Sequence, residues 1–304
     1  VDLQPQGVAP GLHPVGLGPE LGQLLLVELG VVAEPDVEIA LVGEGDGPRG
    51  AHEEEGLDGR RSHRPTILET PRPGHSDFFA GKKFGGYQDY RGGGHFSGRL
   101  TAGIVAAGVL AKKVIEPVSI QAQLLEAGGS ANIDQAVEEA LKNNDSIGGL
   151  VEVQANGVPR ALGEPFFYKA EAALAHMLFS LPAIKGVEFG SGFNAPRMQG
   201  SEHNDAFIDT EGHSATNNAG GITGGMTTGN PLVCRLAVKP TSSIGKNQHT
   251  MNMKTGQMED LELKGRHDAC IALRVPPVAE AAVAVVLADL MLLEQRVGRT
   301  PAHK

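Results

Sequence analysis

The chain has no tryptophan, and aromatic residues make up only 4% of its 304 residues. Proteins that bind single-stranded nucleic acids stack bases on aromatic side chains, so this scarcity argues against such a role. The formal net charge of −10 argues further against binding to nucleic acids or to anionic membranes. Apolar residues make up 40% of the chain, which is enough for a sizeable hydrophobic core.

Cysteine is also scarce. Cys234 and Cys270 are the only two and lie far apart in the sequence, so we expect reduced thiols and a cytoplasmic protein rather than a disulfide framework. No basic stretch followed by an apolar one opens the chain, which gives no sign of secretion. The longest apolar segment, residues 275–293, contains Glu280 and Asp289. Because charges are costly in lipid, we predict a core helix there.

The first 77 residues lack Lys, Asn, Phe, Tyr, Met and Cys, and they hold 14 acidic but only 5 basic residues. Prolines interrupt their apolar runs, of which residues 24–32 could form a strand or a helix and residues 38–42 a strand. We predict little regular structure in an acidic leader, residues 1–69. It is either a disordered segment or the product of a shifted reading frame, and the second explanation accounts better for the missing residue types.

The rest of the chain, residues 70–304, shows clearer patterns. Apolar periodicity predicts helices over residues 100–115, 132–142 and 168–180 and after Pro276, with the first of them buried and capped by Ser97 or Thr101. Alternation predicts strands over residues 150–155, 185–189 and 231–239. Helices and strands are interleaved without strict βαβ spacing, so we predict an α+β fold.

The connecting loops are rich in glycine, hydroxyl groups and charge. RGGGHFSGR at residues 91–99 presents His95 and Arg99 on a flexible backbone, and KPTSSI at residues 239–244 offers one ammonium and several hydroxyl groups. His95 and the pair His267–Asp268 can transfer protons near neutral pH, and arginines bind carboxylates or phosphates with two parallel hydrogen bonds. These features predict a site for an anionic ligand with proton transfer.

Each of these signals also has a simpler reading. GGITGG at residues 220–225 is more typical of a tight turn than of a nucleotide site, because no strand–GxGxxG–helix setting or phosphate-binding loop with Lys accompanies it. KPTSS alone is often an exposed turn, and His75, His203 and His213 could be surface or supporting residues. The histidines lack metal-ligand spacing, so no metal site is predicted.

The loops taken together resemble a known family. RPGHSDFFAGKKFGGYQDYRGGGHFSGRLTAGIVAAGVLAKK is followed in order by DSIGG, GEPFF, KGVEFGSGF, GSEHND, TNNAGGITGG, KPTSSI and KGRHDACIALRVPPVAEA. From about Thr70 to Arg296 this series closely resembles chorismate synthase. The segments GHFSGRLTAGIVAAGVL and RHDACIALRVPPVAEA are similar to two of that family's three signatures.

The resemblance implies a layered β–α–β sandwich and a homotetramer. It implies a carbon–oxygen lyase that removes phosphate from 5-enolpyruvylshikimate 3-phosphate by a 1,4-anti elimination and so forms chorismate, the last step of the shikimate pathway. The reaction needs reduced FMN and no net reducing equivalents, and the family is associated with NADP, the cytoplasm and the biosynthesis of aromatic amino acids. The small-molecule substrate carries two carboxylates and a phosphate.

The resemblance also assigns residues. His95 and Asp268 would be catalytic, with His95 at the flavin and Asp268 taking part in deprotonation, and Arg99 would bind the substrate. Eleven further positions would hold the cofactor together with His95: Phe96, Ser97, Pro182, Ala183, Gly224, Lys239, Pro240, Thr241, Ser242, Ser243 and Arg266.

One signature of the family, a GESHG-like strand end near the N-terminus, has no counterpart, and early arginines that grip the substrate are missing as well. His13 and His52 stand in the wrong context to replace its histidine. The alternative prediction is therefore a catalytically impaired paralogue that binds flavin or phosphate without turnover. Taken literally, the chain keeps a flavin site and lacks one proton donor.

Overall fold

The computed structural model describes residues 69–89, 93–263, 265 and 267–296, and the predicted elements at residues 24–32 and 38–42 lie outside this range. Its centre is a four-stranded sheet with the order β1 (Ser119–Ala127), β2 (Gly149–Asn156), β6 (Leu232–Val238) and β3 (Ile184–Phe189). Every neighbouring pair is antiparallel. The three predicted strands are thus confirmed, whereas β1 was not predicted.

Alternation along β6 explains its central place in the sheet. Leu232, Cys234, Leu236 and Val238 are buried against the helices, while Arg235 points to the opposite face. There the Arg235 guanidinium reaches across to carboxylates on both neighbouring strands, at 2.9 Å from Glu152 and 3.3 Å from Glu188. The other face of the sheet therefore carries a polar row that spans three strands.

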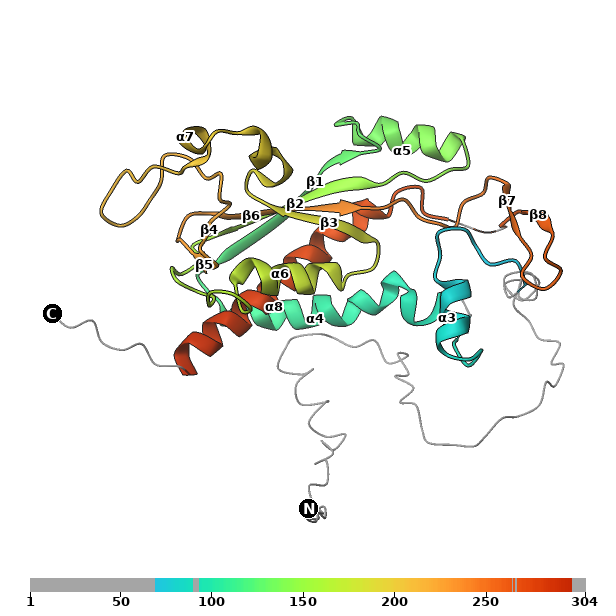
Figure 1. The fold of residues 1–304 in the computed structure, drawn as a ribbon, viewed down its shortest axis with the longest axis horizontal. Helices are drawn as coiled ribbons and strands as arrows, with labels where there is room; N and C mark the ends of the chain where they lie inside the picture. Colours follow the sequence, from blue (N-terminus) through green and yellow to red (C-terminus); the bar gives the residue numbers. More distant parts are fainter. Residues whose placement is uncertain (1–68, 90–92, 264, 266, 297–304) are drawn as a thin grey trace, which may run out of the picture. The chain divides into compact units, whose positions relative to one another are not determined.

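Three helices form the second layer. Helices α6 (Ala170–Phe179) and α8 (Val275–Arg296) cover one face of the sheet, and α4 (Thr101–Val114) lies against α8 (Figure 1). Leu174 and Leu178 of α6 are fully buried. The prolines at 276 and 277 fall in the first turn of α8, where their missing N–H groups cost nothing.

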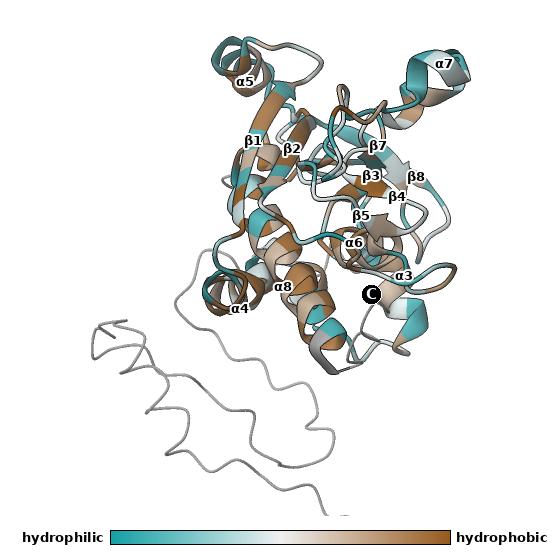
Figure 2. Ribbon diagram, turned by 90° about the vertical axis from the view of Figure 1, so that its left-hand side faces the viewer, coloured by the Kyte–Doolittle hydropathy of each residue, from teal (hydrophilic) through white to brown (hydrophobic). Residues whose placement is uncertain are grey.

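Helix α8 provides much of the core. Most of its buried side chains are alanines and valines, and Figure 2 shows brown, hydrophobic residues along it where it runs beside α4. By length and composition the segment Ile271–Glu294 could cross a membrane, but half of its most apolar window is buried inside the fold, as is usual for a core helix. Glu280 accepts hydrogen bonds from Lys112 of α4 and from the amide of Ala122 in β1.

The prediction of a buried helix at residues 100–115 was right about the helix and wrong about its burial. Only Gly108 and Ala111 of α4 are buried, whereas Val109 is 51% exposed and Val114 is 56% exposed. The reason is that, among the described elements of the sheet and helix layers, α4 packs mainly on α8. An apolar sequence indicates which side chains favour burial, but not whether a second neighbour covers them.

The smaller elements surround the sheet. They are α3 (Asp77–Lys83), the 3₁₀ turns η1 (Gly94–Phe96), η2 (Gly98–Leu100), η3 (Gly192–Arg197) and η4 (Ile271–Arg274), α5 (Ile133–Lys142), α7 (Gly200–His203), and the hairpins β4–β5 (Ile222–Thr223, Met226–Thr227) and β7–β8 (Gln248–Met251, Met258–Leu261). The amide of Met253 donates to the carbonyl of Glu69 at 2.7 Å, and the buried Thr70 donates to Glu259 of β8. These contacts fix the chain just before α3.

The fold is α+β, as predicted: the described residues supply a helical layer and an antiparallel sheet with no parallel βαβ unit.

The approach of α4 to α8 gives a test of the packing. A Cβ at Gly108 would lie 2.3 Å from the Cβ of Ala281, so Gly108→Ala forces the helices apart and should lower the free energy of unfolding by about 1–3 kcal/mol. Gly103 lies on the same helix with nothing within 4 Å of the added atom. Gly103→Ala should therefore stabilise the protein by about 0.5–1 kcal/mol. Denaturant unfolding measures both, and equal effects would contradict this packing.

Candidate active site

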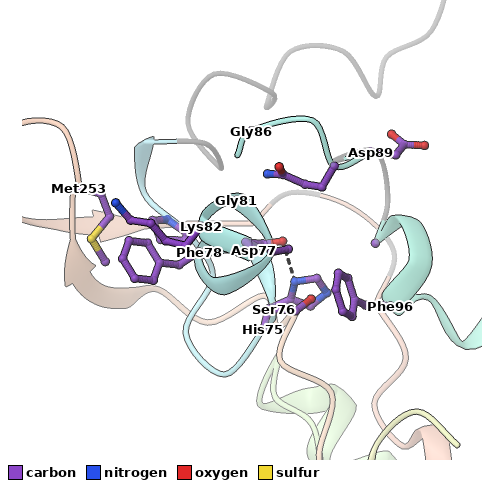
Figure 3. A pocket seen from close by; sticks show the side chains of 14 residues that line it. His75, Ser76, Asp77, Phe78, Gly81, Lys82, Gly86, Asp89, Phe96 and Met253 are labelled. Atoms are coloured by element: carbon purple, nitrogen blue, oxygen red, sulfur yellow. Dashed lines mark ion pairs between the residues drawn. The ribbon is translucent and has the colours of Figure 1, made fainter. Parts of the chain in front are cut away.

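A cavity of about 330 Å³ lies beside α3. Figure 3 shows its lining, in which the ring of Phe78 lies near Met253 and the ring of His75 lies near Phe96. The lining residues come from three stretches of chain: Pro71, His75, Ser76, Asp77, Phe78, Ala80, Gly81 and Lys82; Gly86, Gln88, Asp89, Gly93 and Phe96; and Met253. Its size and its mixture of aromatic walls with a few polar groups are typical of small-molecule sites.

Three charged or polar side chains of one short segment contact one another beside the cavity, and two of them, His75 and Asp77, line it. Asp77, the first residue of α3, accepts from Nε of Arg72 at 2.7 Å and from Nη2 at 2.8 Å. The carboxylate also accepts from the amide of Arg72 at 3.3 Å, and its Oδ1 lies 2.6 Å from Nδ1 of His75. With the proton on Nδ1, the other ring nitrogen is free to accept from Arg72, whose Nη2 lies 3.3 Å away. The three side chains thus form one closed cluster.

Burial makes this cluster electrostatically strong. The side chains of Arg72 and Asp77 are only 9% and 12% exposed. Burial by itself raises the pKa of Asp77, but the hydrogen bonds from Arg72 and His75 outweigh it and hold that pKa far below its usual value. Asp77 therefore stays ionised over the whole physiological range. Lys82 and Asp89 also line the cavity, further along the chain.

The same segment contacts the loop that follows β6, residues 239–243. Nη1 of Arg72 donates to Oγ of Ser243 at 2.9 Å, and Nζ of Lys239 donates to the carbonyl of Gly74 at 2.7 Å. Ser242 lies beside Gly74, since a Cβ added there would be 3.6 Å from that of Ser242. Two loops that are some 165 residues apart in sequence are therefore joined at the site.

The segment before β3 joins them from the other side. The amide of Lys239 donates to the carbonyl of Ala183 at 2.9 Å, and Ala183 has a φ of 70°, which is uncommon for a residue other than glycine. The carbonyl of Thr241 accepts from Oγ of Ser146 at 2.6 Å. Of the predicted cofactor residues, Pro182, Ala183 and residues 239–243 are thus brought together.

The glycine-rich loop supplies Phe96 but directs His95 elsewhere. Gly94 has a φ of 49°, and a Cβ there would lie 2.2 Å from the carbonyl oxygen of Asp89, so only glycine fits. Phe96 lines the cavity, whereas His95 and Arg99 are exposed. Oγ of Ser97 accepts from the amide of Arg99 and thereby caps η2 rather than α4.

Several buried polar atoms near the site have no partner in the described structure. Oγ of Ser76 and Oε1 of Gln88 belong to residues that line the cavity, and Oγ1 of Thr241 belongs to the loop after β6. Buried polar groups are nearly always hydrogen-bonded in native proteins. These three atoms therefore mark places where a ligand or ordered water can bind.

Other predicted residues lie apart from this cavity. Gly224 forms the turn of the β4–β5 hairpin, which Figure 1 places at the far end of the sheet from α3. Asp268 is exposed and pairs with Arg274, Nη2 to Oδ1 at 2.7 Å, and it is not among the lining residues. Arg266 lies outside the described residues.

The sequence analysis missed Asp77, Ser76 and Gln88. A usable signal was present for Asp77, because Arg, His and Asp stand at positions 72, 75 and 77 of one short loop. The sequence analysis quoted that loop only within the series that resembles a known family and treated His75 as a surface or supporting residue. Nothing in the local sequence marks Gln88.

The described part of the chain shows no clustered metal ligands, and its two cysteines are buried. No group of three or more His, Cys, Asp or Glu side chains in that part of the chain could hold a metal ion. Both cysteines are buried and free, and burial, reinforced by the charge of Glu152, raises the pKa of the Cys234 thiol to about 12.

Comparison with known proteins agrees with this fold. The family model described as chorismate synthase matches residues 56–292, beginning earlier than the predicted start near Thr70. A chorismate synthase of Chitinophaga pinensis is 59% identical over 234 residues, which cover 77% of this chain and 70% of that protein. One of Thermococcus gammatolerans is 46% identical over 263 residues, which cover 77% and 74%. A crystal structure of chorismate synthase superposes with a TM-score of 0.58 at 25% identity, covering 73% of this chain and 71% of the other.

The fold and these likenesses define a lyase with an α+β architecture. The chain belongs to the chorismate synthase family. Nothing in the comparisons favours the alternative of an impaired paralogue.

The cluster around Asp77 predicts a pH-dependent stability. Folding lowers the pKa of Asp77. The carboxylate therefore contributes fully to the free energy of unfolding above its unfolded pKa of about 3.9, and this contribution is lost as the pH falls from there towards the folded pKa. At pH 7, Asp77→Asn should lower the free energy of unfolding by about 3 kcal/mol, since it leaves a buried Arg unpaired. The difference from the unchanged protein should shrink at pH 3.

Denaturant unfolding at both pH values measures this. Asp260→Asn is a matched control, because Asp260 also pairs with a histidine, His249, but both side chains are more than 60% exposed. It should change little at either pH. A deficit of Asp77→Asn that is as large at pH 3 as at pH 7 would contradict the assignment.

Proposed function

We propose that this chain is a chorismate synthase that forms chorismate from 5-enolpyruvylshikimate 3-phosphate by 1,4-anti elimination of phosphate, with reduced FMN as its cofactor. The observation that carries the proposal is the meeting of residues 182–183 and 239–243 with the segment 72–77, beside a cavity that includes Phe96. The proposed setting is the last step of the shikimate pathway, in the cytoplasm, in a homotetramer that supports aromatic amino-acid biosynthesis, with NADP as the proposed link to flavin reduction.

The residues present suit the phosphate end of FMN. Lys239 provides a positive charge, and Thr241, Ser242 and Ser243 provide hydroxyl groups within one short loop. The hydroxyl of Thr241 is buried without a partner, as expected of a donor that has not found its acceptor. Pro182 and Pro240 stiffen the two loops, and Arg266 belongs to the same proposed set. Gly224, which was predicted with them, lies on the β4–β5 hairpin at the far end of the sheet from α3.

The ring end of the cofactor would lie near residues 95–97. Phe96 provides an aromatic wall, and Ser97 is already used to cap η2, so its role is to shape the loop. When bound, reduced FMN would supply electron density to the substrate as its phosphate leaves. The protein then has to bind, orient and desolvate the reactants and to move protons.

Two side chains would move those protons. His95, which is exposed in the middle of the loop at residues 91–99, would hold a proton beside the flavin, and Asp268 would accept the proton that the substrate loses. Arg99 binds an anionic group of the substrate through its two parallel N–H donors. Arg274, which pairs with Asp268, orients that carboxylate.

The proposal predicts activity and two sensitive positions. The purified chain, assayed without oxygen in the presence of reduced FMN and substrate, should release phosphate and form chorismate. His95→Ala and Asp268→Asn should each lower kcat by roughly 10²–10⁴-fold, the usual contribution of one acid or base. Because both side chains are exposed, thermal stability should change little.

His249→Ala serves as the control, since His249 is exposed on the β7–β8 hairpin, outside the cavity lining. It should retain the full rate. Flavin binding without any chorismate would contradict the proposal and would favour the impaired paralogue.

A further inference from the structure

Asp77 does more than stabilise its own segment, because each of its two partners also serves a different part of the site. Arg72 uses Nε and Nη2 for Asp77 and still has Nη1 for Ser243, at 2.9 Å. His75 lines the cavity on the side of Phe96 (Figure 3). Without the carboxylate, Arg72 would keep only Ser243 and His75 as described side-chain partners, and His75 would keep only Arg72.

Because the guanidinium of Arg72 is planar, its bonds to Asp77 also determine where it meets Ser243. The bonds of Arg72 to Asp77 set the plane of the group, and Nη1 then points at Ser243. A lysine has one compact ammonium and could not hold both acceptors in that arrangement. The second contact between the loops, from Lys239 to the carbonyl of Gly74, lies two residues from Arg72 and depends on the same segment.

We propose that Asp77 is a positioning residue of the cofactor site, which fixes Arg72 and His75 and through Arg72 holds residues 239–243 in the geometry that receives the cofactor's phosphate. This inference rests on the proposed function, since that function assigns residues 239–243 to FMN. Asp77 touches neither cofactor nor substrate in this account. It acts by orientation alone.

The first test uses two ligands that differ only in the phosphate. Wild-type protein should bind FMN more tightly than riboflavin, as measured by quenching of flavin fluorescence. Asp77→Asn should lower this preference for FMN about tenfold, the effect of one misplaced hydrogen bond to a charged group, and leave riboflavin binding nearly unchanged. Asp77→Glu, which keeps the carboxylate, should recover part of the preference, and Asp260→Asn should retain all of it.

The second test needs no flavin. In the ligand-free protein, amide hydrogen exchange over residues 239–247 should be faster in Asp77→Asn than in the wild type, because the amide of Lys239 and its neighbours lose support. Exchange in α6, whose described contacts lie with α8 and β3, should stay unchanged. Asp260→Asn should exchange as the wild type does.

Arg72→Lys guards against a variant that fails to fold. This variant keeps a positive charge beside Asp77, but its compact ammonium cannot also donate to Ser243 as Nη1 of Arg72 does. It should therefore also weaken the preference for FMN and speed amide exchange over residues 239–247. Wild-type behaviour of folded Asp77→Asn and Arg72→Lys in both tests would overturn the positioning role alone. Equal binding of FMN and riboflavin by the wild type would overturn the phosphate assignment and this proposal with it.

Discussion

The spacing of the helical layer depends on small side chains along α8. Gly108 of α4 faces Ala281 so closely that one methyl group cannot be added, and alanines at 279, 282 and 284 are buried alongside. Because α8 also contacts β1, β2 and α6, its thickness sets the distance between α4 and the sheet. Larger residues in α8 would change that distance everywhere at once, since packed interiors tolerate little extra volume.

The sheet in turn sets the ends of the loops that carry polar groups. Strands β3 and β6 are neighbours, so the segment entering β3 at Ala183 and the loop leaving β6 at Lys239 lie at the same end and share a backbone hydrogen bond. The segment 72–77 belongs to neither strand and is held there by side chains, with Arg72 on Ser243 and Lys239 on Gly74. The framework thus fixes two of the loops, and buried charge fixes the third.

Helices and strands with a regular spacing of apolar residues could be predicted from the sequence. The kinds of side chain in the site, namely a lysine, hydroxyl groups and an aromatic ring, could be predicted as well. Alternation identified β6, and apolar spacing identified α6 and α8. Strand β1 escaped because its pattern is interrupted by a bulge between Leu124 and Glu126. The exposure of α4 was not predicted, because burial depends on which neighbouring elements cover a helix, and an apolar sequence does not show this.

Within the site too, the contacts that could not be predicted depend on how distant segments pack together. The motif around residues 239–243 marked a chemically active loop, but its contact with Arg72 depends on strand order, which the sequence alone did not provide. Asp77 was overlooked because a carboxylate at the start of a short helix is ordinary until its two partners are seen folded onto it. The distance of Gly224 from the cavity likewise follows from topology rather than from its glycine-rich motif.

The strand order has a consequence for synthesis on the ribosome. Strand β3 pairs only with β6 in the described sheet, and β6 follows it by more than 40 residues, while α8, which buries the sheet's apolar face, comes last. A nascent chain that has emerged as far as β3 therefore carries an unpaired strand edge and an uncovered apolar surface. Such species bind chaperones or aggregate. The longer the interval between synthesis of β3 and synthesis of α8, the longer this apolar surface stays uncovered.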